Sequence, residues 1–317
     1  MDQVFVHDDA LAPERLRQLS RRSDLRGWLQ TLSHFAAIGA TGTAVYFTLG
    51  TVWVVMPFIA HGVLINYLYG GQHELSHSTV FGTRGLNEVF GRLIGFILIT
   101  PRDADQIQHF AHHRHTQLWR QDGELFRDRF TLRSYLMRLS GIAYWRANIV
   151  ALLLYAAGKV DEPYIKPAQH TLVIREARLH LAGYAAIAAV SVAADSRAAI
   201  LCWLAPMLLT KSAHQLQNLI EHVGLPHSDD IFANTRSTRT NALMRWMCWQ
   251  MQYHTAHHAF PSVPFFRLRE LHREIFTDRG KAPLTMTYLG FQRAVIQALA
   301  VKGEAEYPDD RAWIEGP

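Results

Sequence analysis

The chain is poor in cysteine and has no segment typical of a linker between domains. Its two cysteines are Cys202, inside an apolar run, and Cys248, which is far away in sequence. No disulfide framework is therefore expected, and the pattern favours a reducing compartment. No Ser/Gly/Pro-rich stretch and no internal repeat divides the 317 residues. These absences exclude a disulfide-stabilised secreted scaffold and a repeat protein.

Charged residues are also scarce, at 19% of the chain, although the formal net charge is +5. The arginines and lysines are scattered and do not form the aromatic-interleaved basic patch of a nucleic-acid-binding protein. The first 27 residues have no apolar core and hence no signal peptide is expected. They carry instead Arg15, Arg17, Arg21, Arg22 and Arg26. An excess of cytoplasmic positive charge on a membrane protein explains this composition better than nucleic-acid binding does.

Long uncharged stretches are present. No Asp, Glu, Lys or Arg occurs between Arg26 and Glu74, which is enough chain for two membrane-spanning helices of about 20 residues each. We predict spans near 32–50 and 51–70. Two shorter apolar runs, near 179–195 and 197–212, predict a second hairpin. The apolar segment Leu139–Gly158 contains Arg146 and is interpreted as an interfacial helix.

The positive charge predicts the orientation. Nearly all Arg and Lys residues lie in the amino-terminal segment, between Arg84 and Arg178, or after His222. Both termini and the large central loop should therefore be cytoplasmic. We expect an integral, multi-pass membrane protein, in three parts. These are a cytosolic amino-terminal segment (1–30), a membrane domain (31–290) and a cytosolic carboxyl-terminal tail (291–317).

Histidine is the outlier of the composition, with 18 residues. Four segments place metal-ligand side chains at helical spacings of i, i+3 or i+4, which bring side chains to one face of a helix about 5–6 Å apart. A single HxxxH has little weight, but two independent HxxHH motifs are rare by chance. The four segments contribute, in chain order, His73 and His77; His109, His112 and His113; Asn218 and His222; and His254, His257 and His258.

The number of ligands indicates the kind of metal site. Zinc needs three or four protein ligands, so nine histidines and an asparagine are too many for one zinc ion. Two metal ions with four or five ligands each would use them, and imidazole suits Zn, Cu, Fe and Ni. His115 and His214 lie at helical spacing from these clusters but outside the repeated pattern. We interpret His61 and Asn66, within the second predicted span, as helix-packing residues.

The order HxxxH, HxxHH, NxxxH, HxxHH, with two apolar hairpins, resembles the membrane fatty acid desaturase and hydroxylase superfamily. The resemblance covers about His73 to His272, and the stretch from Tyr253 to Phe265 is similar to that of bacterial members. It implies an all-α integral membrane protein. About four transmembrane helices in two hairpins would be capped by a cytosolic helical domain that holds a His-rich di-iron site. The resemblance further implies that the protein lies in a bacterial inner membrane.

The resemblance also implies the ligands and the reaction. The nine clustered histidines would bind two irons, Asn218 would hold a metal-bound water, and Asp122, Glu124 and Glu74 are candidates for supporting the ligands. The implied reaction is O2-dependent introduction of a double bond into a lipid or fatty acyl chain. The sequence contains no His-Pro-Gly-Gly segment typical of cytochrome b5, so a separate donor, a ferredoxin or a cytochrome b5, is expected to supply electrons.

Three alternatives stay open at this point. A hydroxylase or ketolase of the same superfamily would use the same ligands. The segment from His73 to His77 also matches HExxH, the motif of zinc metalloproteases in which Glu74 would be the general base. A membrane metal carrier would need polar groups along the spans, where only His61 and Asn66 occur.

Overall fold

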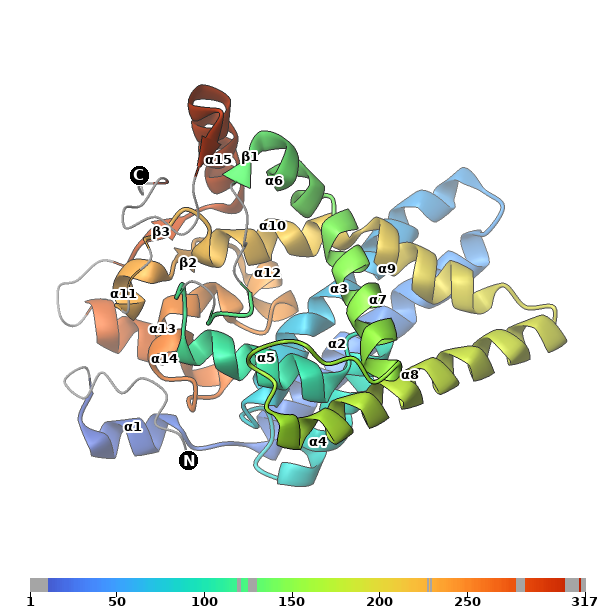
Figure 1. Ribbon diagram of the computed structural model, residues 1–317, viewed down its shortest axis with the longest axis horizontal. Helices are drawn as coiled ribbons and strands as arrows, with labels where there is room; N and C mark the ends of the chain where they lie inside the picture. The colour runs from blue at the N-terminus through green and yellow to red at the C-terminus, as the bar shows by residue number, and fades with distance from the viewer. Residues whose placement is uncertain are drawn as a thin grey trace.

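The computed structural model describes residues 11–118, 121–124, 130–226, 228, 230–277, 283–305 and 314, and these residues are mostly helical (Figure 1). The α-helices are α1 (Pro13–Leu19), α2 (Asp24–Thr48), α3 (Val55–Ser76), α4 (Arg84–Ile97), α5 (Arg102–Arg114), α6 (Leu132–Leu139), α7 (Ile142–Ala156), α8 (Pro167–Ala193), α9 (Ala205–Leu209), α10 (Lys211–His222), α11 (Ile231–Asn234), α12 (Ala242–Met247), α13 (His254–Ala259), α14 (Leu268–His272) and α15 (Tyr288–Lys302).

Short 3-10 and π turns and four two-residue strands complete the described elements. The turns are η1 (Val52–Val54), η2 (Ile200–Leu204), η3 (Met251–Tyr253), η4 (Phe265–Arg267) and η5 (Arg273–Thr277). Strand β1 (Phe130–Thr131) pairs antiparallel with β4 (Glu304–Ala305). Strand β2 (Ser237–Thr238) pairs parallel with β3 (Thr285–Met286).

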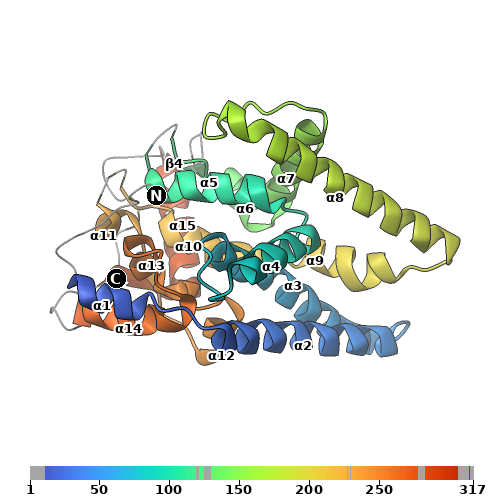
Figure 2. The same ribbon diagram turned by 90° about the horizontal axis from the view of Figure 1, so that it is seen from below.

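The long helices α2, α3 and α8, with η2 and α9, project to one side, and most other elements gather at the opposite end (Figures 1 and 2). The predicted spans lie on these elements, except for the last residues of 197–212, which lie at the start of α10. Helices α2 and α8 begin before the spans predicted on them. Helix α2 begins at Asp24, where the Ser23 hydroxyl accepts a hydrogen bond from the backbone N–H of Arg26. Helix α8 begins at Pro167 and includes polar first turns.

Among the described residues, one helix is long and apolar enough to cross a membrane, from Val52 to Ser76. Helices α6 and α7 would provide a second such element if the pair, bent by 70°, is taken as one span. Length and composition thus support one span of the predicted four, and the other three stay predictions.

Polar side chains within the projecting helices join them to one another. His61 lies 2.9 Å from the Thr41 hydroxyl of α2 and 2.7 Å from the Cys202 carbonyl oxygen of η2. The Asn66 amide donates to the carbonyl of Met207 in α9 and to the Thr210 hydroxyl. Both side chains pack helices together by satisfying buried polar groups, as the sequence predicted.

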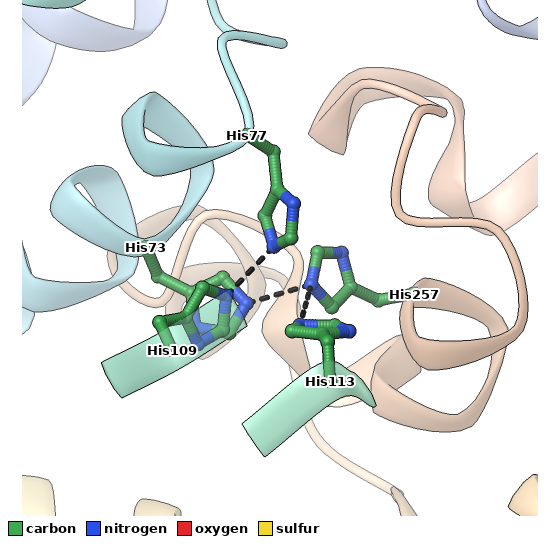
Figure 3. A group of neighbouring side chains, drawn as sticks. All are labelled: His73, His77, His109, His113 and His257. Carbon is green, nitrogen blue, oxygen red and sulfur yellow. Dashed lines mark hydrogen bonds between the residues drawn. The ribbon is translucent and has the colours of Figure 1, made fainter. Parts of the chain in front are cut away.

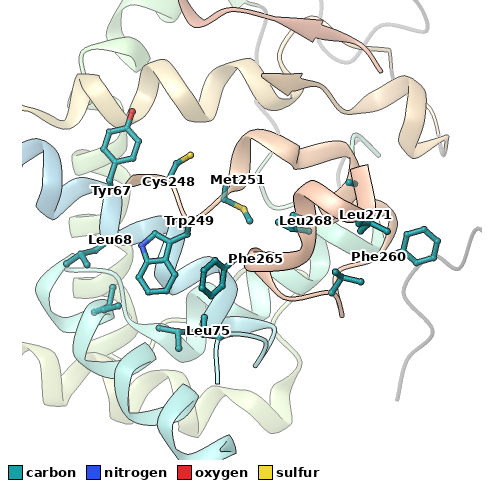
Figure 4. Packing of buried hydrophobic residues seen from close by; sticks show 14 of the residues in the cluster. Tyr67, Leu68, Leu75, Cys248, Trp249, Met251, Phe260, Phe265, Leu268 and Leu271 are labelled. Atoms are coloured by element: carbon teal, nitrogen blue, oxygen red, sulfur yellow. The ribbon is translucent and has the colours of Figure 1, made fainter. Parts of the chain in front are cut away.

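Helix α3 lies at the centre and receives the chain segment that precedes the second HxxHH motif, which contains His254, His257 and His258. Gly70 and Gly71 give this segment its close approach, because a Cβ at Gly71 would lie 2.8 Å from the Trp249 ring and one at Gly70 would lie 2.9 Å from the Cys248 carbonyl oxygen. Trp249 is fully buried beside Leu75 and Phe265 (Figure 4), and its indole N–H donates to His34. This packing brings α13 to the carboxyl end of α3.

The carboxyl-terminal helix α15 is part of the fold. Phe291, Val295 and Leu299 pack in one buried cluster with Leu219 and Ile220 of α10. The boundary predicted between residues 290 and 291 therefore lies inside a helix that supports α10.

The close approach at Gly71 predicts a stability effect. Substituting Gly71→Ala should destabilise the protein by about 1–3 kcal/mol, because the new methyl group overpacks against the Trp249 ring. Gly39→Ala is the matched control, since Gly39 is an exposed residue of α2 with nothing within 4 Å of its Cβ position. This control should be neutral or slightly stabilising. Thermal unfolding of both variants in one detergent measures the difference, and equal midpoints would contradict the packing argument.

Candidate metal centre

Nine histidine side chains meet in two adjacent groups. Within each group the ligand nitrogens lie within 4.8 Å of one another. The first group has five members: His73, His77, His109, His113 and His257. Figure 3 shows their rings converging from α3, α5 and α13. The second group has four: His112, His222, His254 and His258.

The separations of the nitrogen atoms suit shared metal ions. The Nε2 atom of His73 lies 2.7 Å from that of His257, and the Nε2 atom of His254 lies 2.8 Å from that of His222. Imidazole nitrogens that bind one ion at about 2.1 Å must stand close to one another in this way. His258 supplies a further sign, because its Nε2 is buried with no hydrogen-bond partner. The residues present therefore fit two metal ions.

Helix geometry delivers the ligands in sets. The spacing i, i+3, i+4 directs His109 and His113 of α5 into the first group and His112 into the second. Helix α5 is held at its amino end by α8, where the Glu176 carboxylate accepts backbone N–H bonds from Arg102 and Asp103. A carboxylate is favourable there because it satisfies orphan N–H groups at the positive end of the helix dipole.

Burial keeps most of these imidazoles uncharged. It lowers the pKa of His113, His254 and His258 well below the usual range, and neighbouring histidines add to the effect. Burial also lowers the pKa of His112, but the carboxylates of Asp122 and Glu124 outweigh it and raise the value to about 9. Because metal binding requires an unprotonated ring nitrogen, an ion in the second group would displace that proton from His112 Nε2.

Four carboxylates lie beside the Nδ1 atoms of four ligand rings. Asp122 accepts from Nδ1 of His112 at 2.9 Å. The other pairs are Glu74 with His257 at 3.3 Å, Glu221 with His254 at 3.6 Å and Glu124 with His109 at 3.8 Å. The hydrogen bond from His112 to Asp122 orients that ring and increases its basicity toward a metal. In the other three pairs the Nδ1 atom has no hydrogen-bond partner among the described residues, and the carboxylate acts through its charge. Four carboxylates also match the four positive charges of two divalent ions.

Asp122, Glu124 and Glu74, which the sequence predicted as supporting residues, each lie beside a clustered histidine. The Glu74 carboxylate is fully buried and accepts hydrogen bonds from the Thr79 hydroxyl and the backbone N–H of Phe265. A general base of a zinc metalloprotease must reach a metal-bound water. These partners hold one carboxylate oxygen of Glu74 and leave the other 3.3 Å from Nδ1 of His257, a placement that disfavours the metalloprotease alternative.

The structure places Asn218, His115 and His214, the other positions considered in the sequence, outside the two histidine groups. Asn218 lines the same chamber as Glu124. Neither His115 nor His214 belongs to either group. The sequence did not lead us to predict Glu221 as a carboxylate beside a ligand ring, although it directly precedes His222. A carboxylate adjacent to a predicted ligand was the available signal, but only the tertiary structure directs it to His254.

The Asp122 contact predicts a change in metal affinity. Asp122→Asn should weaken metal binding by about 10–100-fold, because the neutral amide cannot hold His112 in the same way. Asp161→Asn, at an exposed position, is the control. Metal retained per chain after dialysis against graded chelator measures the effect. Retention equal to that of the wild type would show that Asp122 does not support the ligand.

Comparison with known proteins agrees with this geometry. Residues 47–290 match the family model described as fatty acid desaturase. A search of curated proteins found no match. The matched segment covers most of the chain and contains all nine clustered histidines. The chain therefore belongs to the fatty acid desaturase family.

Proposed function

We propose that this protein is an O2-dependent di-iron oxidoreductase that introduces a double bond into a lipid or fatty acyl chain. The observation that carries the proposal is the division of nine buried histidines into adjacent groups of five and four in a member of this family. One zinc ion would leave more than half of these ligands unused. Hydroxylation by the same site is the alternative outcome.

The roles of the residues follow from their contacts. Bound iron would supply the activation of O2 needed to attack an unactivated C–H bond. Asp122 holds the His112 ring by a hydrogen bond to Nδ1, and Glu74 and Glu221 place negative charge 3.3 Å and 3.6 Å from Nδ1 of His257 and His254. Glu124 Oε2, 4.0 Å from His112 Nε2 and partly exposed to the neighbouring chamber, is placed to move protons. Desaturation removes two hydrogen atoms from the substrate and reduces O2 to two waters, with two electrons and two protons from outside.

We also propose that the projecting helices α2, α3, α8 and α9 form a four-span stem in a bacterial inner membrane, with both termini cytoplasmic. The exposed large apolar side chains on these helices support this proposal, among them Phe47, Met56, Leu179, Val190 and Leu209. Family membership and the apolar helix Val52–Ser76 agree with it. The histidine groups would then lie where the stem meets the cytosolic cap.

A basic surface on the cap suits a separate acidic electron donor. Helices α1 and α14 lie side by side, joined by ion pairs from Arg15 to Glu270 and Glu274 (Figure 2). The exposed arginines there are Arg17, Arg21, Arg22, Arg269 and Arg273. The His272 ring of α14 contacts that of Tyr253, at 5.0 Å between centroids, and Tyr253 directly precedes the ligand His254. This contact provides a short route to the second group.

Charge reversal tests the donor surface. Arg269→Glu combined with Arg273→Glu should raise the KM for reduced ferredoxin or cytochrome b5 about tenfold at low salt, and high salt should shrink the difference. Arg293→Glu, an exposed position on α15, is the control. An unchanged KM in the double variant would remove α14 from the donor site.

Metal content and product together test the function. Detergent-purified protein should contain about two irons per chain with a coupled di-iron Mössbauer signal, and lipids of an expressing host should gain a double bond. His112→Ala and His257→Ala should abolish product while an expressed membrane protein remains. His170→Ala, outside both groups, should not. One zinc and no iron would overturn the proposal, and a hydroxylated product would select the alternative.

A further inference from the structure

The hairpin formed by α8 and η2 contains an apolar groove of about 630 Å³. Its two arms stand apart in both views of the chain (Figures 1 and 2), and the rings of Tyr184 on α8 and Trp203 on η2 bridge them, with 5.9 Å between their centroids. A groove of this size lies within the range typical of small-ligand sites. None of the described residues that line it belongs to either histidine group, so its occupant would not contact a clustered histidine.

The outer half of α8 is not buried by the described part of the chain. The buried residues of this helix end at His180, and none of the described residues from Leu181 to Ala193 is buried. Gly183 permits a close approach at the base of this half, since a Cβ there would lie 2.6 Å from the Phe96 ring. In the proposed stem, the gap beyond it faces hydrocarbon. Apolar chains fill such a gap, because an empty one loses the dispersion contacts of its walls.

Aromatic rings line the end of the groove nearer α4. The Tyr184 hydroxyl and the Trp203 indole N–H donate to the backbone carbonyl oxygens of Phe96 and Ile97. These polar atoms are thus used within the protein, and the rings present carbon to the groove. The apolar residues of the walls are Ile187, Ala188, Ile200 and Leu204. This part of the groove suits a hydrocarbon chain.

The other end of the groove is charged. Asp195, Ser196 and Arg197 lie in the turn between α8 and η2, and all three line the groove. The turn is fixed by its own hydrogen bonds, because the Ser196 N–H donates to the Ser191 carbonyl oxygen and the Ser196 hydroxyl accepts from the backbone N–H of Ala198. The carboxylate of Asp195 and the guanidinium of Arg197 are exposed there. This end therefore offers one site for a cation and one for an anion.

The dimensions of the groove suit one leaflet of a bilayer. The helix from Tyr184 to Val192 is about 12 Å long at 1.5 Å per residue, and the charged turn follows directly after it. One leaflet contributes about 15 Å of hydrocarbon thickness. A helix of a second chain is about 10 Å across, so 12 Å of it would occupy about 900 Å³. That is more than the groove holds, which favours a lipid chain as its occupant.

We propose that the groove binds one bilayer phospholipid, with an acyl chain between α8 and η2 and a zwitterionic, primary-amine head at the turn. The phosphate contacts Arg197, and the ammonium group donates hydrogen bonds to Asp195. A quaternary amine has no hydrogen to donate, and a head without an amine leaves the Asp195 carboxylate beside negative charge. The lipid is a structural ligand and not the substrate. This inference rests on the membrane stem of the proposed function but not on its reaction.

A lipid in the groove would support the metal centre through α8. The Glu176 carboxylate of α8 accepts backbone N–H bonds from Arg102 and Asp103 at the start of α5, and α5 carries three of the clustered histidines. A ligand that binds the folded protein and not the unfolded chain raises its stability. Added lipid of the proposed class should therefore raise the midpoint of thermal unfolding.

Native mass spectrometry of the detergent-purified holoprotein tests the class of lipid. The protein is titrated with dipalmitoyl phosphatidylethanolamine, phosphatidylcholine and phosphatidylglycerol, which share their acyl chains and differ in the head. One phosphatidylethanolamine should bind about three- to fivefold more tightly than either of the others, as expected for contacts to exposed charges. Equal or tighter binding of phosphatidylcholine or phosphatidylglycerol would overturn the proposal.

Variants locate the site. Ala188→Phe fills the groove and should weaken phosphatidylethanolamine binding at least tenfold, remove the rise in unfolding midpoint and leave the metal content unchanged. Ala186→Phe is the matched control, because Ala186 is an exposed residue of the same helix that does not line the groove. Asp195→Asn should abolish the preference for phosphatidylethanolamine over phosphatidylcholine. Unchanged phosphatidylethanolamine binding in Ala188→Phe would also overturn the proposal.

A second copy of the chain is the competing occupant. A wild-type dimer that Ala188→Phe converts to a monomer, with lipid binding unchanged, would assign the groove to a subunit interface and overturn the proposal. The two proposals also fail separately. Zinc in place of iron, together with selective phosphatidylethanolamine binding, would refute only the di-iron function. Two irons with no preference among the lipids would refute only the lipid site.

Discussion

Two divalent ions held by uncharged imidazoles would introduce four positive charges into a buried region, where an isolated charge is costly. The contacts between four carboxylates and the Nδ1 atoms of His109, His112, His254 and His257 offset that cost. Each carboxylate comes from a segment that also carries a ligand or lies close to one. At His112 the same contact is a hydrogen bond that also fixes the direction of the ring, so charge balance and ligand geometry depend there on Asp122.

Bringing these rings together requires close packing around one helix. Helix α3 carries the first motif at its carboxyl end, and its two adjacent glycines admit the Cys248–Trp249 turn. That turn leads directly into the second HxxHH motif, which begins at His254. Helix α10 carries His222 and is supported from behind by α15. The metal centre is therefore the meeting point of elements whose packing is set by small and large side chains at some distance from it.

The two cavities near the metal centre differ in polarity. The side toward the projecting helices has an apolar groove, and the chamber next to the ligands is polar.

The sequence by itself predicted the nine clustered histidines, because helical spacing is local and is written in positions i, i+3 and i+4. It also predicted Glu74, Asp122 and Glu124 as supporting residues, and helices at all four apolar runs. Only the tertiary structure decided the division into five and four, the pairing of each carboxylate with its ring, and the contribution of Glu221. These depend on contacts between segments up to about 180 residues apart, such as Glu74 with His257, which no local periodicity records. Helices α2 and α8 begin before the spans predicted on them for a related reason: hydropathy marks the apolar part of a helix, whereas caps and tertiary contacts decide where the helix begins.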